Sequence, residues 1–392
     1  MATAVAPAPP TKTSADVELM EFVVDRNQLL TEVAATARVS DTKSTQPLLT
    51  HLLLRARGGG VLSITGTDLQ RTVTTECPAA IKTLGEATVP AQKLLSYIKL
   101  LPEGRVTMKL LPNQHIQITA GHSKTKMPGM APNSFPAAPA AGAATVRLSS
   151  RGLKTLIRQS LFAVASSGDR YLFNSALLLL RADRMGMVAT DGHRLSLVEV
   201  QEEGLAIDGY QKVLLPRECM GDLLSLFGSS KDESVAFSET DNTIFFQIGH
   251  RTLSVRKIVG QFPNYDAIIP RDAMDSIVLG TADFMGSLQR VLQFSDEKSA
   301  GVRLHIDKNA LTVSASAPGS GESQEALETS YTGDALTIGF NGHYIAEFLK
   351  TIGTEGAVRV SLKNGSSAVV ITPESFNPEY QQKYVVMPMR VN

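Results

Sequence analysis

One pattern of about 125 residues occurs three times in this chain of 392 residues. Pro90, Pro216 and Asn341 stand at matching points, each where a short apolar strand ends and a helix with apolar residues three and four apart begins. Similarity at a fixed spacing constrains the architecture before any single motif does. Because the spacing is the size of a domain, it predicts three copies of one domain rather than a solenoid of short repeats.

Each repeat also contains a predicted β-hairpin, because an alternating apolar run with polar turn residues near its middle begins at Val106, Val235 and Val358. A strand followed by a helix opens each copy, and the expected helix N-caps are Asp25, Ser150 and Thr281. The repeats therefore predict an α+β fold with two helices packed on antiparallel sheets in each domain. The expected boundaries are a disordered tail over 1–19 and domains over 20–145, 146–272 and 273–392.

Composition places the chain among soluble globular proteins, since 43% of its residues are hydrophobic and the mean hydropathy is zero. Apolar runs long enough to cross a membrane are absent from the sequence. The first residues lack the charged and apolar regions of a secretory signal. Cys77 and Cys219 lack metal-binding spacing, which is typical of a reducing cytoplasm. We therefore expect a cytoplasmic protein with no metal and no cofactor.

The net charge is zero, but it is unevenly spread. Residues 20–145 contain 13 lysines and arginines against 8 acidic residues, whereas residues 273–392 contain 9 against 13. This difference would favour head-to-tail pairing of the first repeat with the third, although random drift of surface charge would also produce it. The six predicted helices contain ten cations and five anions, as a phosphate-facing surface requires and as ordinary solvated helices also show.

Phosphate-loop, dinucleotide-binding, zinc-protease and nucleophile-elbow motifs are absent from the sequence. In the string ATDGHRLSLV, Asp191 and His193 could form an acid–base pair, which leaves an enzyme as one alternative. Asp191 and Gly192 are more typical of a turn before a strand, and no nucleophile or metal ligand accompanies them. A second alternative is a β-rich scaffold or adhesion protein, which the missing secretion signal and unpaired cysteines disfavour. We therefore predict a protein that is not an enzyme.

Several motifs resemble one family, the bacterial DNA sliding clamp or beta subunit of DNA polymerase III. They are ATDGHRL (189–195), FPNYDAIIP (262–270), YVVMPMRV (384–391), LSITGTDLQ (62–70), VPAQKLL (89–95) and GVRL (301–304). The resemblance extends from about Glu21 to the C-terminus. It implies a homodimer in which two three-domain chains close head to tail into a ring around duplex DNA. Such a processivity factor needs only weak, sequence-independent contacts, because a closed ring retains DNA by topology and not by affinity.

The resemblance also implies the residues of three sites. DNA-contacting positions of the family are matched by Lys43, Arg170 and Tyr171. The further positive residues expected near the inner face or the interface, and so to bind DNA, are Lys93, Lys124, Lys126 and Arg217. A pocket between the second and third domains would bind linear peptides of the replicative polymerase, the clamp loader and repair proteins. Its matching residues are Phe173, Thr190, Gly192, His193, Arg194, Leu195, Pro263, Ile268, Asn341, Tyr344, Val386, Met387, Pro388, Met389 and Arg390. The dimer interface would include Thr125, Gln293 and Phe294.

The chemistry of these pocket residues suits a site for varied peptides. Unbranched Met387 and Met389 can adapt to different apolar side chains, and Gly192 permits close approach of a backbone. Arg194 and Arg390 are expected at a polar rim. The sequence departs from the family pattern at Phe173, where leucine is usual, and at Ala267, where arginine is common, so the peptide preference is expected to differ.

Overall fold

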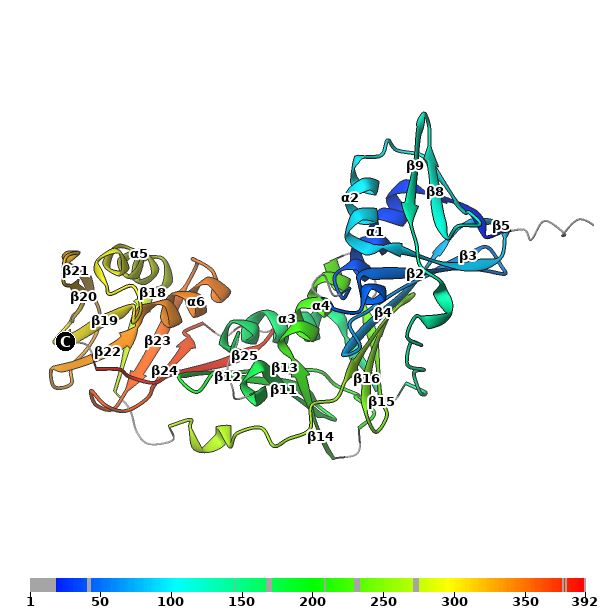
Figure 1. The fold of residues 1–392 in the computed structure, drawn as a ribbon. Helices are drawn as coiled ribbons and strands as arrows, with labels where there is room; N and C mark the ends of the chain where they lie inside the picture. The colour runs from blue at the N-terminus through cyan, green and yellow to red at the C-terminus, as the bar shows by residue number, and fades with distance from the viewer. Residues whose placement is uncertain are drawn as a thin grey trace, which may run out of the picture. The chain divides into compact units, whose positions relative to one another are not determined.

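The computed structural model describes residues 19–40, 44–144, 146–166, 171–207, 209–228, 233–270, 275–375, 377 and 379–390. They form two compact units, which Figure 1 shows as ribbons. The first unit runs to Ala140 and includes His250–Ser254, and the second contains the rest of the chain. The third repeat and the second repeat without His250–Ser254 therefore lie in one unit.

The first unit packs two helices against antiparallel strands around an aliphatic core (Figure 1). Five strands hydrogen-bond in the order β5-β1-β7-β8-β9, and β4, β3, β2 and β6 are neighbours in a second sheet. The Asp25 carboxylate caps α1 by accepting from the N–H groups of Asn27 and Gln28 at 2.9 and 3.1 Å. The elements are β1 (Glu21–Asp25), α1 (Arg26–Ala37), η1 (Pro47–Thr50), β2 (His51–Arg57), β3 (Val61–Thr67), β4 (Arg71–Pro78), β5 (Ala80–Thr83), β6 (Gly85–Pro90), α2 (Ala91–Leu100), β7 (Arg105–Leu110), β8 (His115–Ala120), β9 (Ser123–Pro128) and η2 (Pro132–Ser134).

A buried ion pair joins α1 to the segment His250–Ser254, which starts strand β17 (Arg251–Arg256). Arg251 donates to both carboxylate oxygens of Glu32, at 2.9 and 2.6 Å, and is 2% exposed. Burial alone would raise the pKa of Glu32, but hydrogen bonds from Arg251, Thr75 and His250 hold it below its usual value. The charged carboxylate therefore ties this distant segment into the core of the first unit.

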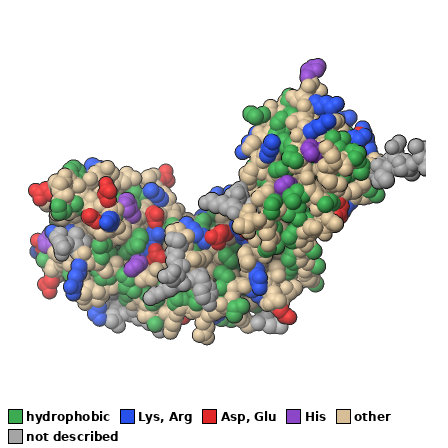
Figure 2. Space-filling model, in the orientation of Figure 1, with side chains coloured by type: hydrophobic (Ala, Val, Ile, Leu, Met, Phe, Trp, Pro, Cys, Tyr) green, Lys and Arg blue, Asp and Glu red, His purple; other side chains and the backbone are tan. Residues whose placement is uncertain are grey.

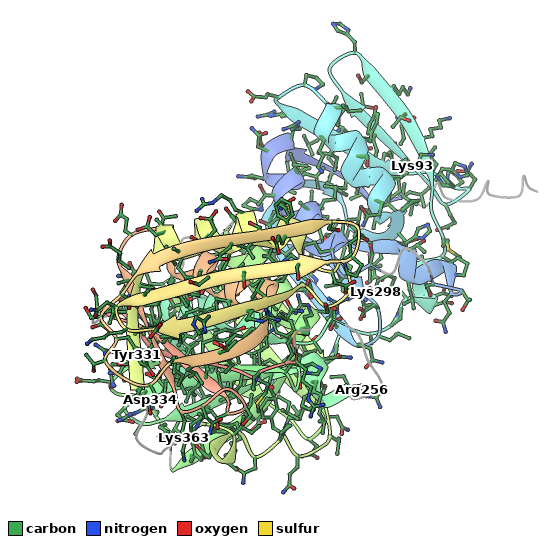
Figure 3. All side chains as sticks on the ribbon, turned by 90° about the vertical axis from the view of Figure 1, so that its left-hand side faces the viewer. Lys93, Arg256, Lys298, Tyr331, Asp334 and Lys363 are labelled. Atoms are coloured by element: carbon green, nitrogen blue, oxygen red, sulfur yellow. The ribbon has the colours of Figure 1, made fainter. Side chains whose placement is uncertain are left out.

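The second unit contains a sheet shared by two repeats. Its eight strands run in the order β14-β11-β12-β13-β25-β24-β23-β18, because β13 of the second repeat pairs with β25 at the end of the third. Four further strands form the sheet β21-β20-β19-β22, which faces the viewer in Figure 3, and β10, β15 and β16 hydrogen-bond to one another in that order. Two helices of each repeat lie against these sheets (Figure 1).

The elements of the second repeat, apart from β17, are β10 (Val146–Ser149), α3 (Ser150–Ser160), η3 (Leu161–Ala163), η4 (Tyr171–Asn174), β11 (Ser175–Arg181), β12 (Arg184–Thr190), β13 (Arg194–Gln201), β14 (Tyr210–Pro216), α4 (Arg217–Gly228), β15 (Ser234–Glu239), β16 (Thr243–Ile248) and η5 (Tyr265–Ala267). Those of the third are β18 (Asp275–Gly280), α5 (Thr281–Val291), η6 (Leu292–Phe294), β19 (Gly301–Asp307), β20 (Ala310–Ala317), β21 (Gly321–Glu328), β22 (Leu336–Asn341), α6 (Gly342–Ile352), β23 (Ala357–Leu362), β24 (Val369–Pro373) and β25 (Gln381–Val386). The α+β class with antiparallel sheets is confirmed, and so are the three helices predicted after Pro90, Pro216 and Asn341.

Two predicted helix caps are wrong. Ser149 caps α3 in place of Ser150, because its hydroxyl accepts from the N–H of Gly152 at 3.0 Å. Gly280 occupies the cap of α5, so Thr281 is the first helical residue. Residues 1–18 of the predicted tail lie outside the described residues, and the three domain boundaries stay a prediction. Within the described chain, no helix is long and apolar enough to cross a membrane.

Candidate functional site

The turn between β12 and β13 is held by its own side chains. The Asp191 carboxylate accepts from the backbone N–H groups of His193 and Arg194 at 2.9 and 3.0 Å. The Thr190 hydroxyl donates to the carbonyl of Arg194 at 2.6 Å and accepts from the N–H of Gly192 at 3.1 Å. Gly192 has a φ of +91°, which residues with a Cβ rarely adopt. These local bonds fix the direction in which His193 and Arg194 leave the turn.

Arg194 is buried, with 9% of its side chain exposed, rather than exposed at a rim as expected. Its Nε donates to Asp191 at 2.9 Å, and its guanidinium also pairs with Glu347 on α6. The guanidinium lies 4.3 Å from the centre of the Tyr344 ring. Burial acts to lower the pKa of Arg194, but Tyr384, Glu347 and Asp191 together raise it. Arg194 is therefore a charged link between the turn and α6.

The C-terminal segment lies against the same turn. The N–H of Met387 donates to the carbonyl of His193 at 2.8 Å, and the N–H of Met389 donates to Gly339 at 2.8 Å. The His193 and Tyr344 rings stack with centroids 6.4 Å apart and planes inclined by 22°. Met387, Pro388 and Met389 are partly exposed, and Arg390 is exposed. Met387 therefore lies at the turn beside the stacked His193 and Tyr344 rings, and such apolar and aromatic groups are typical of a pocket for apolar side chains.

Several other predicted pocket residues are placed close to this surface. Phe173 lies beside the turn, since a Cβ on Gly192 would come within 3.6 Å of its ring. Leu195 is buried in an apolar cluster against which Ile268 packs. Asn341 caps α6 by accepting from the N–H of His343 at 3.0 Å, so its side chain holds the helix that bears Tyr344.

Two residues predicted for the pocket, Pro263 and Val386, are placed differently from those that border the exposed surface beside the turn. Pro263 lines a cavity of about 460 Å³ together with Leu177 and Leu214 of β11 and β14. Val386 is fully buried in the core of the third repeat and is not brought to the apolar cluster of Leu195. Val385, which the sequence reasoning missed, belongs to that cluster. Neighbouring side chains on a strand point to opposite faces of the sheet, so Val385 and Val386 cannot both reach this cluster. Which of the two reaches it depends on how β25 pairs with β13, and local sequence patterns do not show that pairing.

The enzyme alternative places Asp191 and His193 in an acid–base pair. Both Asp191 oxygens are engaged, one by the two backbone N–H groups of the turn and the other by the Arg194 guanidinium. His193 is exposed and stacks on Tyr344. Among the described residues, no group of three or more histidine, cysteine or acidic side chains could hold a metal ion. The arrangement therefore positions a turn and offers no proton-transfer pair.

The predicted DNA-binding residues fall into three groups. Lys43 and Arg170 lie outside the described residues, as does the side chain of Tyr171. Lys93 on α2, labelled in Figure 3, and Lys124 and Lys126 on β9 are exposed in the first unit. Figure 2 shows lysine and arginine side chains gathered over this α2 and β8–β9 end of the unit.

Arg217, at the start of α4, has a structural role besides its charge. It donates to the carbonyls of Leu161 and Val164 at 2.9 and 2.6 Å. It lines a cavity of about 760 Å³ in the second unit with Arg158 and Lys350, two exposed cations that the site prediction left out. Both sit on predicted helices, so the excess of helical cations was the signal that could have found them.

The predicted dimer residues lie at two strand edges. Thr125 is on β9, the edge strand of its five-stranded sheet, and β21 is the edge strand of the four-stranded sheet. Phe294 in η6 lies beside the first residue of β21, since a Cβ on Gly321 would be 3.7 Å from its ring, whereas Gln293 is exposed. The sequence reasoning missed β21, whose acidic string GESQEALE was the available signal.

Family models and known proteins match the chain over almost its whole length. The models are the N-terminal, central and C-terminal domains of DNA polymerase III beta subunit, over residues 20–139, 147–264 and 266–390. Beta sliding clamps of Pseudomonas aeruginosa and Pseudomonas putida are 31% and 32% identical over 95% of this chain and 100% of theirs. A Pseudomonas aeruginosa sliding clamp bound to griselimycin superposes with a TM-score of 0.87 and 29% identity, covering 95% of this chain and 100% of that one.

Proposed function

This chain belongs to the family of bacterial DNA polymerase III beta subunits, the beta sliding clamps, and we propose that two copies of it close head to tail into a ring around duplex DNA. The chain is a processivity factor, which holds a DNA polymerase on its template. Retention then depends on ring closure and not on strong phosphate contacts, which would weaken steeply with salt. The zero net charge is compatible with this mechanism.

The observation that supports the ring best is a pair of edge strands with opposite charge. β9 exposes Lys124 and Lys126, whereas β21 exposes Glu322 and Glu328. Figure 2 shows acidic side chains at the β19–β21 end of the second unit. An edge strand leaves backbone N–H and C=O groups unpaired, so these edges can extend each other's sheets between two copies. Thr125, Gln293 and Phe294 would lie in or beside this interface.

DNA would be contacted without regard to its sequence. The exposed lysines Lys93, Lys124 and Lys126 and the cations Arg158 and Lys350 can interact with phosphates, together with Lys43, Arg170, Tyr171 and Arg217. Contacts of this kind are individually weak and depend on ionic strength. They would steer the duplex within the ring while leaving it free to slide.

Partner proteins would bind at the surface made by the turn, α6 and the C-terminal segment, which we call the peptide pocket. It comprises the fifteen residues predicted for this site with Val385 in place of Val386. Its partners would be linear segments of the replicative polymerase, the clamp loader and repair proteins. We further propose that griselimycin binds here, because the solved relative carries that ligand.

The proposal includes a cytoplasmic location, no catalytic activity, and domain boundaries at 20–145, 146–272 and 273–392. The topological mechanism is tested by loading the protein onto nicked circular DNA and then cutting the circle once. We expect the protein to stay on the circle in high salt and to leave the linear form. Equal retention on both forms would contradict encirclement.

A charge exchange tests the interface. Light scattering should show a dimer for the natural chain and at least about tenfold weaker dimerisation for the double variant K124E/K126E, because like charges would then face each other. Adding E322K/E328K should restore the dimer. A double variant that remains fully dimeric would rule out this pair of edges.

A further inference from the structure

The peptide pocket lies at one end of a continuous face of the eight-stranded sheet. Side chains two residues apart on a strand share a face, and strand register aligns them in rows. One row contains Thr190, Leu195, Val385 and Val370. The next row contains Val188, Leu197 and Lys383, and the third contains Gly186, Glu199 and Gln381. The face therefore changes from apolar at Leu195 to polar at Glu199 along β13.

A groove of about 380 Å³ lies over the second and third rows. We call it the flanking groove, and its principal lining residues are Leu197, Glu199, Thr372, Pro373, Tyr380 and Lys383. Leu197 also packs against the apolar cluster of Leu195 and Val385. The groove and the apolar cluster therefore share one wall, and no other strand separates them.

The lining has the composition of a peptide-binding surface. Leu197, Pro373 and the half-buried ring of Tyr380 offer apolar contact, while Glu199 and Lys383 offer a carboxylate and an ammonium group. Glu374 is already engaged by Arg359 at 2.5 Å. Burial raises the pKa of the Tyr380 hydroxyl, which already hydrogen-bonds with the Asn377 side chain, so the ring is the part of this residue that a peptide can contact. An extended chain presents this same mixture of apolar side chains and backbone polar groups.

We propose that the flanking groove is a second subsite, which binds the residues of a partner peptide that flank those held in the peptide pocket. The inference rests on the proposed function of that pocket. Leu195 and Glu199 are four residues apart on one strand, about 13 Å, so about four extended residues of the partner span the two subsites. The occupant carries an apolar or aromatic side chain that packs on Leu197, Pro373 and Tyr380.

The experiment uses dodecapeptides selected on the full-length chain from a random display library and retained only if griselimycin displaces them. Each peptide is fluorescently labelled and trimmed from either end, and affinities are measured by anisotropy. For the natural chain, the untrimmed peptides should bind about tenfold more tightly than the versions trimmed at one end, as burial of one further apolar side chain implies. In Y380A the gain in affinity of the untrimmed over the trimmed peptides should disappear, while the trimmed peptides bind as tightly as they bind the natural chain.

Two further variants separate contact from folding. Y380F keeps the ring and should retain the gain. Y210A removes a 39% exposed tyrosine from β14 of the same sheet, outside the groove, and should also retain it. A gain that persists in Y380A, or no gain in the natural chain, would overturn the flanking groove and leave the peptide pocket standing. Failure to select any peptide that griselimycin displaces would overturn the peptide pocket, and the groove with it.

Discussion

The turn between β3 and β4 and the turn between β12 and β13 are built from the same bonds in two different repeats. Thr67-Asp68-Leu69-Gln70-Arg71 matches Thr190-Asp191-Gly192-His193-Arg194. In the first turn the Asp68 carboxylate accepts from the N–H groups of Gln70 and Arg71 at 2.9 and 2.6 Å, and from the Arg71 side chain at 2.7 Å. The Thr67 hydroxyl donates to the carbonyl of Arg71 at 2.9 Å. The second turn has each of these bonds.

The surroundings of the two turns differ. Arg194 reaches Glu347 and the Tyr344 ring on α6, and the carbonyl of His193 receives the C-terminal segment. The third position is Gly192 in one turn and Leu69 in the other, where a leucine that is 49% exposed has a φ of +71°. The turn is thus a structural device that orients an arginine. The second copy meets Tyr344 and Glu347 of α6 and the C-terminal segment that contains Met387, and we propose a peptide site there.

The largest loss of stability and of griselimycin affinity is expected when Arg194 is replaced by alanine, and Arg71 is its counterpart in the first turn. R194A leaves Asp191 and Glu347 without their buried partner, so the free energy of unfolding should fall by about 3 kcal/mol. Griselimycin affinity should fall by about 100-fold, because Tyr344 loses its support. R71A removes a more exposed arginine, 18% exposed, and should cost about 1 kcal/mol with unchanged griselimycin affinity. Chemical denaturation and calorimetry measure both quantities, and equal loss of affinity in the two variants would contradict the comparison.

A smaller effect is expected from E347Q, which weakens the ion pair between α6 and the second turn. Glu347 is 44% exposed, so the fold should persist while griselimycin affinity falls roughly fivefold. E86Q is the matched control, since Glu86 is 45% exposed and pairs with Arg55 at 2.8 Å in the first unit. If E347Q and E86Q bind griselimycin equally well, Asp191 alone is enough to hold Arg194 in place.

A loss of stability smaller than that of R194A is expected at the third position of each turn. Gly192→Leu should lower the free energy of unfolding by about 1 to 2 kcal/mol, because a Cβ is strained at a φ of +91°. Leu69→Gly should change it by less than about 1 kcal/mol, since relief of strain offsets the added freedom of glycine in the unfolded chain. Thermal denaturation of both variants measures the difference. If Leu69→Gly lowered the free energy of unfolding as much as Gly192→Leu, Leu69 would have to pack against more of the protein than its exposure indicates.

Local patterns in the sequence determined much of this protein. The starts of α2, α4 and α6, the hairpins that begin near Val106, Val235 and Val358, and the antiparallel α+β class follow from periodicity and turn residues. Such features depend on neighbours within a few residues, so one sequence contains the information. The family resemblance added the site around Arg194, and the structure adds the contacts that fix that arginine.

Tertiary structure alone decided which distant residues meet. The pairing of Arg194 with Val386 across β13 and β25 joins segments 192 residues apart, and it places Val385 beside Leu195 while Val386 enters the core. The same pairing aligns Leu197 with Lys383 and so creates the flanking groove. Register between strands so far apart depends on the packing of the whole unit, because a slip of one residue would exchange the two faces of a strand. No local pattern encodes that choice.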